Sequence, residues 1–297
     1  MNKLIKKADI LIEALPYIRT LAGKTVVIKY GGSAMVHEEL KEGFAEDVVL
    51  LKYVGLQPII VHGGGPQINE ILDKFGIEAK FLHGIRVTDQ PTMEVVEMVL
   101  GGKINKEIVS LLNQHGAKAV GLTGKDGRLL TTKPFNPKSL IHTYSGSTDV
   151  LHPEDYGLVG QVSHVDTTLL HTLQEANFIP VIAPIGVDAK WKTNNINADL
   201  VAGSVAAAVQ AEKLLVLSDV KGIRDANNRH VSTLSRKDME RMVKKQVISA
   251  GMLPKVHACL TALQGGVRKA HIIDGRVPHA VLLEIFTDKG IGTEILA

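Results

Sequence analysis

Two glycine-rich segments, each directly after a β-branched run, are the residues of this sequence best suited to chemistry. They read Lys29-Tyr30-Gly31-Gly32 and His62-Gly63-Gly64-Gly65-Pro66. Glycines let the backbone approach a ligand closely and turn several amide N–H groups toward one point, which favours anions. Pro66 fits the first position of a helix, and a helix N-terminus also attracts anions. Together with the lysine, the two segments predict a site that handles phosphate.

Two common nucleotide-binding motifs are absent from the sequence. The pattern G-x-x-x-x-G-K-[ST] does not occur, because Gly124-Lys125 is followed by Asp126, which indicates a turn. The triple glycine does not match G-x-G-x-x-G either, because Ile68 occupies the last position. The sequence therefore disfavours both a P-loop enzyme and a simple dinucleotide-binding domain.

A run of polar residues, which includes three asparagines and an aspartate, forms a second candidate cluster. It reads Asn194-Asn195-Ile196-Asn197-Ala198-Asp199. Asn197 suits a helix N-cap, and Asp199 in the first turn suits the helix dipole. That structural explanation leaves Asn195 unexplained. A functional explanation is that the amides bind a polar substrate while Asp199 orients cationic groups, and both explanations stay open.

Three further segments contain candidate binding residues. Lys255 falls in the first turn of a predicted helix, where a lysine is unfavourable unless a negative group is nearby. The planar fork of Arg86 could hold a carboxylate at two points, although a surface ion pair would also explain it. Ser218 and Asp219 follow a predicted strand at its carboxyl end, the usual ligand edge of an open α/β sheet.

An alternation of β-branched runs and amphipathic stretches must position these residues. Strands are predicted at residues 25–30, 58–62, 118–122, 179–184, 213–218 and 270–273, with short β-like pieces around 126–127 and 158–165. Helices are predicted at 4–21, with a kink at Pro16, and at 38–54, 66–75, 91–115 with a break near Gly101-Gly102, 167–176, 198–210, 236–245 and 253–265. The pattern predicts an α/β fold, a three-layer αβα sandwich with a central, mostly parallel sheet.

The composition excludes several classes of protein. The 297 residues are 45% hydrophobic and 22% charged, with a net charge of +3 and only 4% aromatic residues, which disfavours nucleic-acid binding. No apolar run approaches the ~20 residues that a membrane span needs. The single cysteine, Cys259, excludes an intramolecular disulfide and fits a reducing compartment. We therefore expect a cytoplasmic protein that binds neither nucleic acid nor membranes.

In its order of segments, the sequence closely resembles the amino acid kinase family, in particular the members that phosphorylate N-acetyl-L-glutamate. The matching segments are Lys29–Gly32, His62–Pro66, Gly84–Thr88, Asn195–Asp199, Ser218–Gly222 and Gly251–Lys255. The resemblance covers residues 24–297 and implies a carbamate kinase-like fold. It implies an N-terminal lobe at 23–190 that binds N-acetylglutamate and a C-terminal lobe at 191–297 that binds ATP and arginine.

The implied reaction transfers the γ-phosphoryl group of ATP to the side-chain carboxylate of N-acetyl-L-glutamate, giving N-acetyl-L-glutamyl 5-phosphate in arginine biosynthesis. By resemblance, Lys29 contacts the transferring phosphoryl group, Lys255 stabilises the leaving ADP, and Asp199 orients both lysines. The implied phosphoryl and ATP contacts are Gly31, Gly32, Gly63, Gly64, Gly65, Ser218 and Asp219. The implied substrate contacts are Gly64, Gly65, Arg86, Asn195 and Asn197. Mg²⁺ should arrive with ATP, and no protein ligand to a metal is expected.

Residues 1–22 predict an amphipathic helix ahead of the first strand, with a stripe of apolar residues. The stripe suits pairing between subunits, although the helix could instead pack on its own subunit. Family members with such a helix are hexamers, trimers of dimers, that L-arginine inhibits. The resemblance places an arginine site at Tyr17, His271, Glu284 and Gly290. The sequence does not decide whether a PII signalling protein binds.

Two alternative functions remain open at this point. One is an N-acetyl-aminoadipate kinase of lysine biosynthesis, because one methylene in a substrate changes binding by only ~1–3 kcal/mol. The other is a non-catalytic sensor of arginine or nucleotide, which the joint presence of Lys29, Asp199 and Lys255 disfavours.

Overall fold

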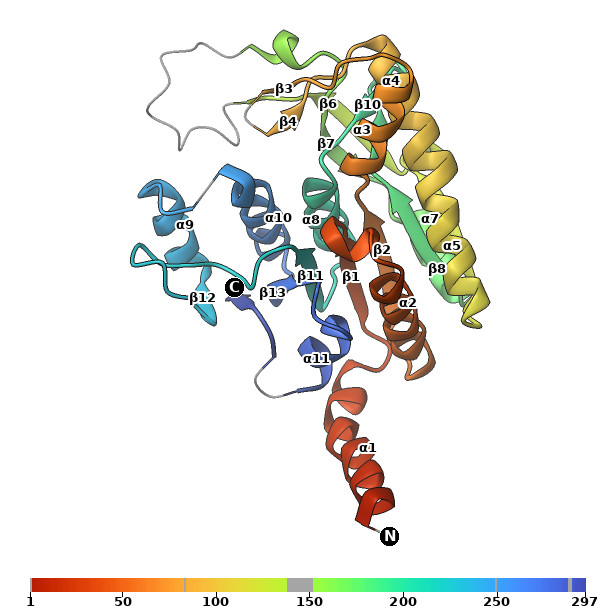
Figure 1. The fold of residues 1–297 in the computed structure, drawn as a ribbon, viewed down its shortest axis with the longest axis vertical. Helices are drawn as coiled ribbons and strands as arrows, with labels where there is room; N and C mark the ends of the chain where they lie inside the picture. The colour runs from red at the N-terminus through yellow and green to blue at the C-terminus, as the bar shows by residue number, and fades with distance from the viewer. Residues whose placement is uncertain (1, 83, 138–151, 249, 288–289) are drawn as a thin grey trace.

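In the computed structural model, an eight-stranded sheet lies between two layers of helices (Figure 1). The structure describes residues 2–82, 84–137, 152–248, 250–287 and 290–297, without the side chains of 2–4, 6–8, 11 and 250. The strand order is β12-β14-β13-β11-β1-β2-β8-β5, and of these neighbours only β13 and β14 are antiparallel. The strands are β1 (Thr25–Tyr30), β2 (Gln57–His62), β5 (Ala119–Thr123), β8 (Ile179–Ala183), β11 (Lys213–Ser218), β12 (Thr233–Ser235), β13 (Lys269–Asp274) and β14 (Thr293–Leu296).

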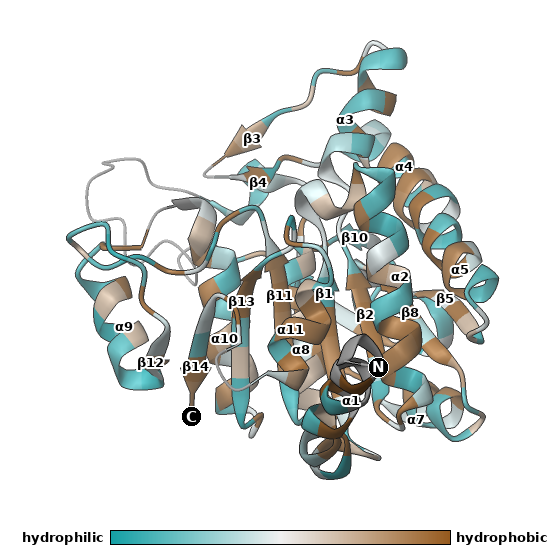
Figure 2. Cartoon of the chain, turned by 60° about the horizontal axis from the view of Figure 1, so that its bottom comes forward, coloured by the Kyte–Doolittle hydropathy of each residue, from teal (hydrophilic) through white to brown (hydrophobic). Residues whose placement is uncertain are grey.

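The central strands are buried on both faces, and their side chains alternate between two cores. In β1, Val26 and Ile28 enter one core while Val27 enters the other. Figure 2 shows β1, β2 and β11 as hydrophobic. The first core is covered by α2 (Glu38–Tyr53), α3 (Gly65–Lys74), α4 (Gln90–Glu97), α5 (Asn105–Gln114) and α11 (Ala280–Phe286). The second is covered by α7 (Thr168–Glu175), α8 (Ala198–Ala208), α9 (Arg236–Lys244) and α10 (Leu253–Gln264).

A smaller sheet and a hairpin lie beyond the carboxyl end of the central strands, at the top of Figure 1. The small sheet has the order β10-β9-β6-β7, and the hairpin pairs β3 with β4. Their strands are β3 (Phe81–Leu82), β4 (Ile85–Arg86), β6 (Leu130–Pro134), β7 (Gly160–Val165), β9 (Ile185–Val187) and β10 (Thr193–Asn195). The candidate residues of the hairpin and of β10 are thereby carried over the glycine-rich end of the sheet.

The α/β fold predicted from the sequence is confirmed, and several local predictions need correction. The β-like piece expected at Asp126-Gly127 is a 3-10 turn, Asp126–Arg128, because Gly127 has a φ of 56° and the Asp126 side chain caps Thr123; the strand follows it as β6. The expected break near Gly101-Gly102 is instead a π-helical segment, η2 (Met98–Ile104), that joins α4 to α5. Short strands such as β9, β10, β12 and β14 were not predicted, since three or four residues give little periodicity.

The N-terminal helix α1 (Asn2–Leu21) extends away from the sheet (Figure 1), and its end contacts α11. The helix continues through Pro16. In the predicted stripe, Ile5, Ile12 and Leu15 are 51%, 67% and 49% exposed, whereas the side chains of Leu4, Ala8 and Leu11 lie outside the described residues. These residues form an exposed apolar surface on α1. In the described part of the chain, no helix combines the length and hydrophobicity needed to cross a membrane.

Candidate active site

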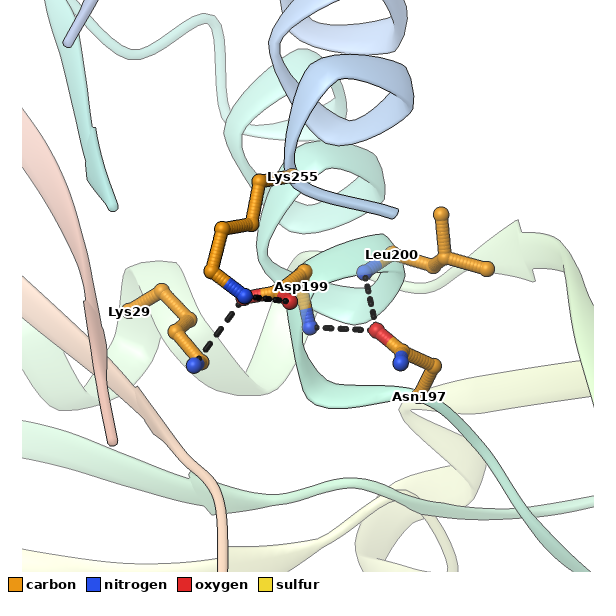
Figure 3. Close-up of polar contacts among 5 residues, drawn as sticks. All are labelled: Lys29, Asn197, Asp199, Leu200 and Lys255. Atoms are coloured by element: carbon orange, nitrogen blue, oxygen red, sulfur yellow. Dashed lines mark hydrogen bonds and ion pairs between the residues drawn. The ribbon is translucent and has the colours of Figure 1, made fainter. Parts of the chain in front are cut away.

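Asp199 lies between Lys29 and Lys255 (Figure 3), as the resemblance to the amino acid kinase family implied. Its Oδ1 is 3.0 Å from Lys29 Nζ and its Oδ2 is 3.3 Å from Lys255 Nζ. Lys29 comes from the carboxyl end of β1, Asp199 from the first turn of α8 and Lys255 from the first turn of α10. Three segments far apart in the sequence therefore place two cations and one anion together.

Burial makes this ion triad electrostatically strong. Asp199 is 5% exposed and Lys29 is 7% exposed. Burial alone would raise the pKa of the Asp199 carboxyl, but the charges of Lys29 and Lys255 outweigh that effect and hold this pKa below its usual range. Asp199 therefore stays ionised, and removing one partner of such a buried pair costs about 3–5 kcal/mol.

The backbone around Asp199 is set by a helix cap. The Asn197 side-chain oxygen accepts hydrogen bonds from the backbone N–H groups of Asp199 and Leu200, at 2.9 and 3.3 Å (Figure 3). The predicted N-cap is confirmed, and it fixes the direction in which the Asp199 side chain leaves α8. A substrate-binding role for Asn197 stays a prediction.

The two glycine-rich segments lie side by side at the ends of β1 and β2, where Gly63 N–H donates to the Tyr30 carbonyl at 2.8 Å. A side chain at Gly31 would collide with Lys29 Nζ, 2.6 Å from the position of its Cβ. A side chain at Gly64 would collide with Leu100 and Ile104 of the π-helical segment. Small residues are therefore required for the lysine and the second segment to pack this closely.

Asp219, at the end of β11, ties the first glycine segment to the C-terminal half. Its Oδ1 accepts a hydrogen bond from Ser33 N–H at 2.7 Å. Gly32 has a φ of 72°, and a Cβ there would lie 2.5 Å from the same oxygen. Asp219 thus holds the turn η1 (Gly32–Met35), and the neighbouring Ser218 is buried.

Arg86 is a buried cation without an acidic partner among the described residues. It is 8% exposed, and its Nη2 donates to Asn69 Oδ1 at 2.6 Å and to the Gly65 carbonyl at 3.2 Å. Its guanidinium also lies 4.7 Å from the centre of the Phe81 ring. Burial lowers the pKa of the Arg86 guanidinium, and its Nη1 has no hydrogen-bond partner within the described part of the chain. Such a group calls for an anionic ligand.

One cavity of about 200 Å³ brings most predicted site residues together. It is lined by Lys29, Gly63, Gly64, Gly65, Arg86, Asn195, Asn197 and Asp199, among others. Asn195 donates to Thr88 Oγ1 at 3.1 Å, which links β10 to the hairpin segment. Five of the predicted site residues do not line this cavity: Gly31, Gly32, Ser218, Asp219 and Lys255. Of these, Lys255 contacts Asp199, which does line it.

A second cavity, of about 1110 Å³, contains all four residues predicted to bind arginine. Tyr17 comes from α1, His271 from β13, Glu284 from α11, and Gly290 lies after that helix. Glu284 Oε1 is 2.6 Å from His271 Nδ1, and Oε2 accepts from Ile291 N–H at 2.8 Å. A Cβ at Gly290, which has a φ of 55°, would lie 2.8 Å from Glu284 Oε2. Residue 83, before the Gly84–Thr88 segment, and residues 288–289, before Gly290, lie outside the described residues.

Sequence reasoning missed several residues that complete the first site. Asn69 and Phe81 hold the Arg86 side chain, and Asn105 contacts the histidine that precedes the triple glycine. Asn69 lies one helical turn beyond Gly65, so its position on the helix face next to the glycines was the available signal. Cys259 is buried in the core, and burial raises the pKa of its thiol.

Comparison with known proteins defines the class to which this site belongs. Residues 24–274 match the amino acid kinase family. The fold resembles carbamate kinase from Giardia, with a TM-score of 0.66 at 17% identity over 93% of this chain and 99% of that one. The chain belongs to the amino acid kinase family.

Full-length relatives define the enzyme more narrowly. The chain is 56% identical to acetylglutamate kinase from Geotalea uraniireducens over 100% of both chains, and 54% identical to that of Aquifex aeolicus over 99% of both. It is thus a kinase of the acetylglutamate kinase type, an ATP-dependent phosphotransferase with a carboxyl group as acceptor, in arginine biosynthesis.

A structural relative from a different enzyme class is also similar. The N-acetylglutamate synthase from Neisseria gonorrhoeae, complexed with coenzyme A and N-acetyl-glutamate, has a TM-score of 0.82 at 26% identity. This chain is covered over 98% of its length but spans only 63% of the synthase. The same synthase complexed with coenzyme A and L-arginine has a TM-score of 0.79 at 25% identity, with 97% and 65% of the two chains covered.

Proposed function

We propose that the cavity around Asp199 transfers the γ-phosphoryl group of ATP to the side-chain carboxylate of N-acetyl-L-glutamate, giving N-acetyl-L-glutamyl 5-phosphate. The observation that carries this proposal is the buried arrangement of Lys29, Asp199 and Lys255 beside the glycine-rich segments. A carboxylate is already a nucleophile, so the reaction needs no general base. Catalysis then consists of holding two mutually repelling anions in line and neutralising the transferring phosphoryl group.

Each proposed role follows from position and charge. Lys29 contacts the transferring phosphoryl group, and Lys255 stabilises the charge that develops on ADP. Asp199 orients both ammonium groups. The N–H groups of Gly32, Gly64 and Gly65 donate to phosphoryl oxygens. The Gly64 N–H has no hydrogen-bond acceptor among the described residues, which supports this role. The remaining ATP contacts are Gly31, Gly63, Ser218 and Asp219.

The free Nη1 of Arg86 is the donor proposed for the α-carboxylate of the substrate. Nη2 is already held by Asn69 and the Gly65 carbonyl, so the guanidinium is fixed before the substrate arrives. Asn195 and Asn197 receive the amide and carboxylate region. An N-acetyl-aminoadipate substrate and a purely sensory role have no support from the full-length relatives.

Mg²⁺ enters this proposal as part of the substrate, bound to the phosphates of ATP. Both carboxylate oxygens of Asp199 face lysine ammonium groups, which makes this aspartate a poor metal ligand. The described residues contain no group of three or more histidine, cysteine, aspartate or glutamate side chains that could hold a metal ion. In this proposal the magnesium ion arrives with ATP and neutralises charge on its phosphates.

Acyl-phosphate formation, trapped with hydroxylamine, tests the reaction directly. Purified protein with ATP and Mg²⁺ should convert N-acetylglutamate faster than N-acetyl-aminoadipate, glutamate or aspartate. A preference for N-acetyl-aminoadipate would move the enzyme to the alternative substrate. Absence of acyl phosphate from every carboxylate would overturn the proposed function.

We also propose that L-arginine inhibits the enzyme by binding in the second cavity. Glu284 offers a buried carboxylate to a guanidinium, and His271 Nε2 is buried without a hydrogen-bond partner among the described residues. Tyr17 brings α1 into the same cavity. The structural similarity to a synthase complexed with L-arginine supports this choice of ligand.

The exposed apolar residues of α1 support a further proposal, that the helices of neighbouring subunits pair in a hexamer built as a trimer of dimers. Because α1 also lines the arginine cavity, such pairing would place that cavity next to the contact between subunits. A cytoplasmic location completes the proposal. The sequence leaves binding of a PII signalling protein open, and pull-down with a purified PII protein tests it.

A further inference from the structure

His62 is a buried histidine next to the triple glycine that the reaction as proposed above does not use. It ends β2, is 0% exposed and is followed directly by Gly63. Burial lowers the pKa of its imidazole to about 4, an effect that nearby Lys106 reinforces and the hydrogen bond to the Gly63 carbonyl partly offsets. The ring is therefore neutral near pH 7, so one nitrogen donates and the other accepts.

The neighbours of His62 define which nitrogen carries the hydrogen. Nδ1 lies 2.8 Å from the carbonyl oxygen of Gly63, which can only accept, so Nδ1–H is the donor. Nε2 is then an acceptor, and Asn105 Nδ2 lies 3.2 Å from it. The alternative tautomer would leave Nδ1 and the carbonyl as two acceptors in contact.

Asn105 is itself fixed in one orientation. Its Nδ2 also donates to the Val181 carbonyl at 2.9 Å, and its Oδ1 accepts from Lys106 Nζ at 3.1 Å. Both donors and the acceptor of the amide are therefore used. A Cβ at Gly121 would collide with this amide, so a glycine in β5 makes room for it. Asn105 is 0% exposed, and the bonds make it a rigid support for the His62 ring.

Holding the Gly63 carbonyl also fixes the next N–H group. The Gly63 C=O and the Gly64 N–H belong to one planar trans peptide unit, in which they point in opposite directions. The His62 bond to the carbonyl therefore sets the direction of the Gly64 N–H. On the other side, Leu100 and Ile104 of the π-helical segment leave no space for a Cβ at Gly64, and π-helical turns are frequent at functional sites.

We propose that His62, held by Asn105, is a positioning residue that fixes the Gly64 N–H toward the transferring phosphoryl group. This role rests on the proposed function, in which the Gly64 N–H is a phosphoryl donor. His62 acts through the peptide unit and touches no substrate. Its contribution appears when charge develops on the phosphoryl oxygens, so it affects kcat more than the KM of either substrate.

Two substitutions separate the two hydrogen bonds of the ring. His62→Asn keeps a donor near the position of Nδ1 and loses the acceptor for Asn105. His62→Gln keeps an acceptor near the position of Nε2 and loses the donor to Gly63. Loss of a preorganised donor costs ~10²–10³ in kcat, and a donor that is only misdirected should cost about 10–100-fold. We therefore expect His62→Gln to lose about 10–100-fold in kcat and His62→Asn to retain kcat within about fivefold.

The matched controls are His171→Asn and His171→Gln, at an exposed histidine of α7 outside the site, which should leave kcat and KM unchanged. Equal kcat for wild type, His62→Gln and His62→Asn would overturn the proposal while the kinase reaction stands. Parallel losses in both His62 variants that follow their melting temperatures would also overturn it, because they would indicate a purely structural role.

A second measurement does not depend on turnover. Solid-state ¹⁵N spectra of the protein labelled in histidine should contain the signal of a neutral imidazole with its hydrogen on Nδ1 from pH 5.5 to pH 8, and its absence from spectra of His62→Gln would assign it to His62. A hydrogen on Nε2 would overturn the proposal. Wild-type protein that makes no acyl phosphate would instead overturn the proposed function, and with it the phosphoryl role of Gly64, whatever the tautomer.

Discussion

The cavity around Asp199 and the cavity beneath α1 each contain a buried carboxylate, but the two carboxylates have different partners. Asp199 has a lysine at each oxygen, in a cavity of about 200 Å³. Glu284 has His271 at one oxygen and a backbone N–H at the other, in a cavity of about 1110 Å³. Asp199 is saturated with permanent cations and can only orient them. Among the described residues Glu284 makes no ion pair with a lysine or arginine, although the charge of nearby Lys213 interacts with it, so it can accept a ligand that brings a cation.

The ion triad of Lys29, Asp199 and Lys255 gives the largest effect that tests this comparison. Lys29→Ala and Lys255→Ala should each lower kcat by about a hundredfold or more, because each removes a positioned cation from the phosphoryl path. Steady-state kinetics and ATP binding by calorimetry measure this, and ATP should still bind. Lys74→Ala, at an exposed lysine paired with Glu70, is the control. Normal turnover in either site variant would exclude the proposed mechanism.

Arg86 tests the substrate end of the same cavity. Arg86→Lys should raise the KM for N-acetylglutamate by about 10–100-fold, because it loses a charged hydrogen bond from Nη1 and the two-point geometry of the guanidinium. The value of kcat should change far less. Arg128→Lys, at a surface arginine stacked on Trp191, is the matched control. An unchanged KM in Arg86→Lys would remove this residue from the site.

Glu284 tests the second cavity. Glu284→Gln should raise the arginine concentration for half-inhibition by about tenfold or more, since a charged partner of the guanidinium is lost. Inhibition curves measure this. Glu212→Gln changes another acidic residue that lines the cavity and pairs with Arg268, and it should have a smaller effect. If millimolar arginine does not inhibit the wild-type enzyme, the cavity is not an inhibitory arginine site.

The apolar surface of α1 should govern assembly. Removal of residues 1–22 should convert hexamers into dimers, and Ile12→Lys should weaken the hexamer, because both remove apolar surface from the helix pair. Light scattering after size-exclusion chromatography gives the mass. Asp9→Asn makes the same change of +1 in net charge at an exposed polar position and serves as the control. An unaltered mass after removal of the helix would contradict its role in assembly.

The smallest expected effect is on stability in acid. The folded state holds the pKa of His62 at about 4, below the ordinary histidine value of 6.5. Between these two pH values the unfolded chain therefore binds a proton that the folded chain does not bind. His62 therefore favours unfolding progressively as the pH falls from about 6.5 to about 4. As the pH falls, the urea midpoint of unfolding should decrease less steeply in His62→Gln than in wild type or His171→Gln. Equal slopes would show that His62 does not titrate in this way.

Local sequence determined much of the fold because its signals act over a few residues. The β-branched runs predicted β1, β2, β8 and β11 closely, and Asn197 predicted the start of α8. The carboxyl ends of parallel strands meet at one edge, so the glycines after β1 and β2 had to lie together. The resemblance of segments then carried roles to Lys29, Asp199 and Lys255 before their contacts were known.

Only the tertiary structure decided how isolated polar groups are paired. Periodicity does not reveal that Arg86 is buried without an acidic partner among the described residues, or that Asn105 of α5 contacts His62 of β2, because both depend on elements distant in the sequence. The same holds for the π-helical segment beneath Gly64. From the two glycines in this segment, the sequence predicted a break in the helix. The sequence alone determined which groups could handle phosphate, whereas long-range packing decided which of them are charged, held or left free for a ligand, since burial and partners set those properties.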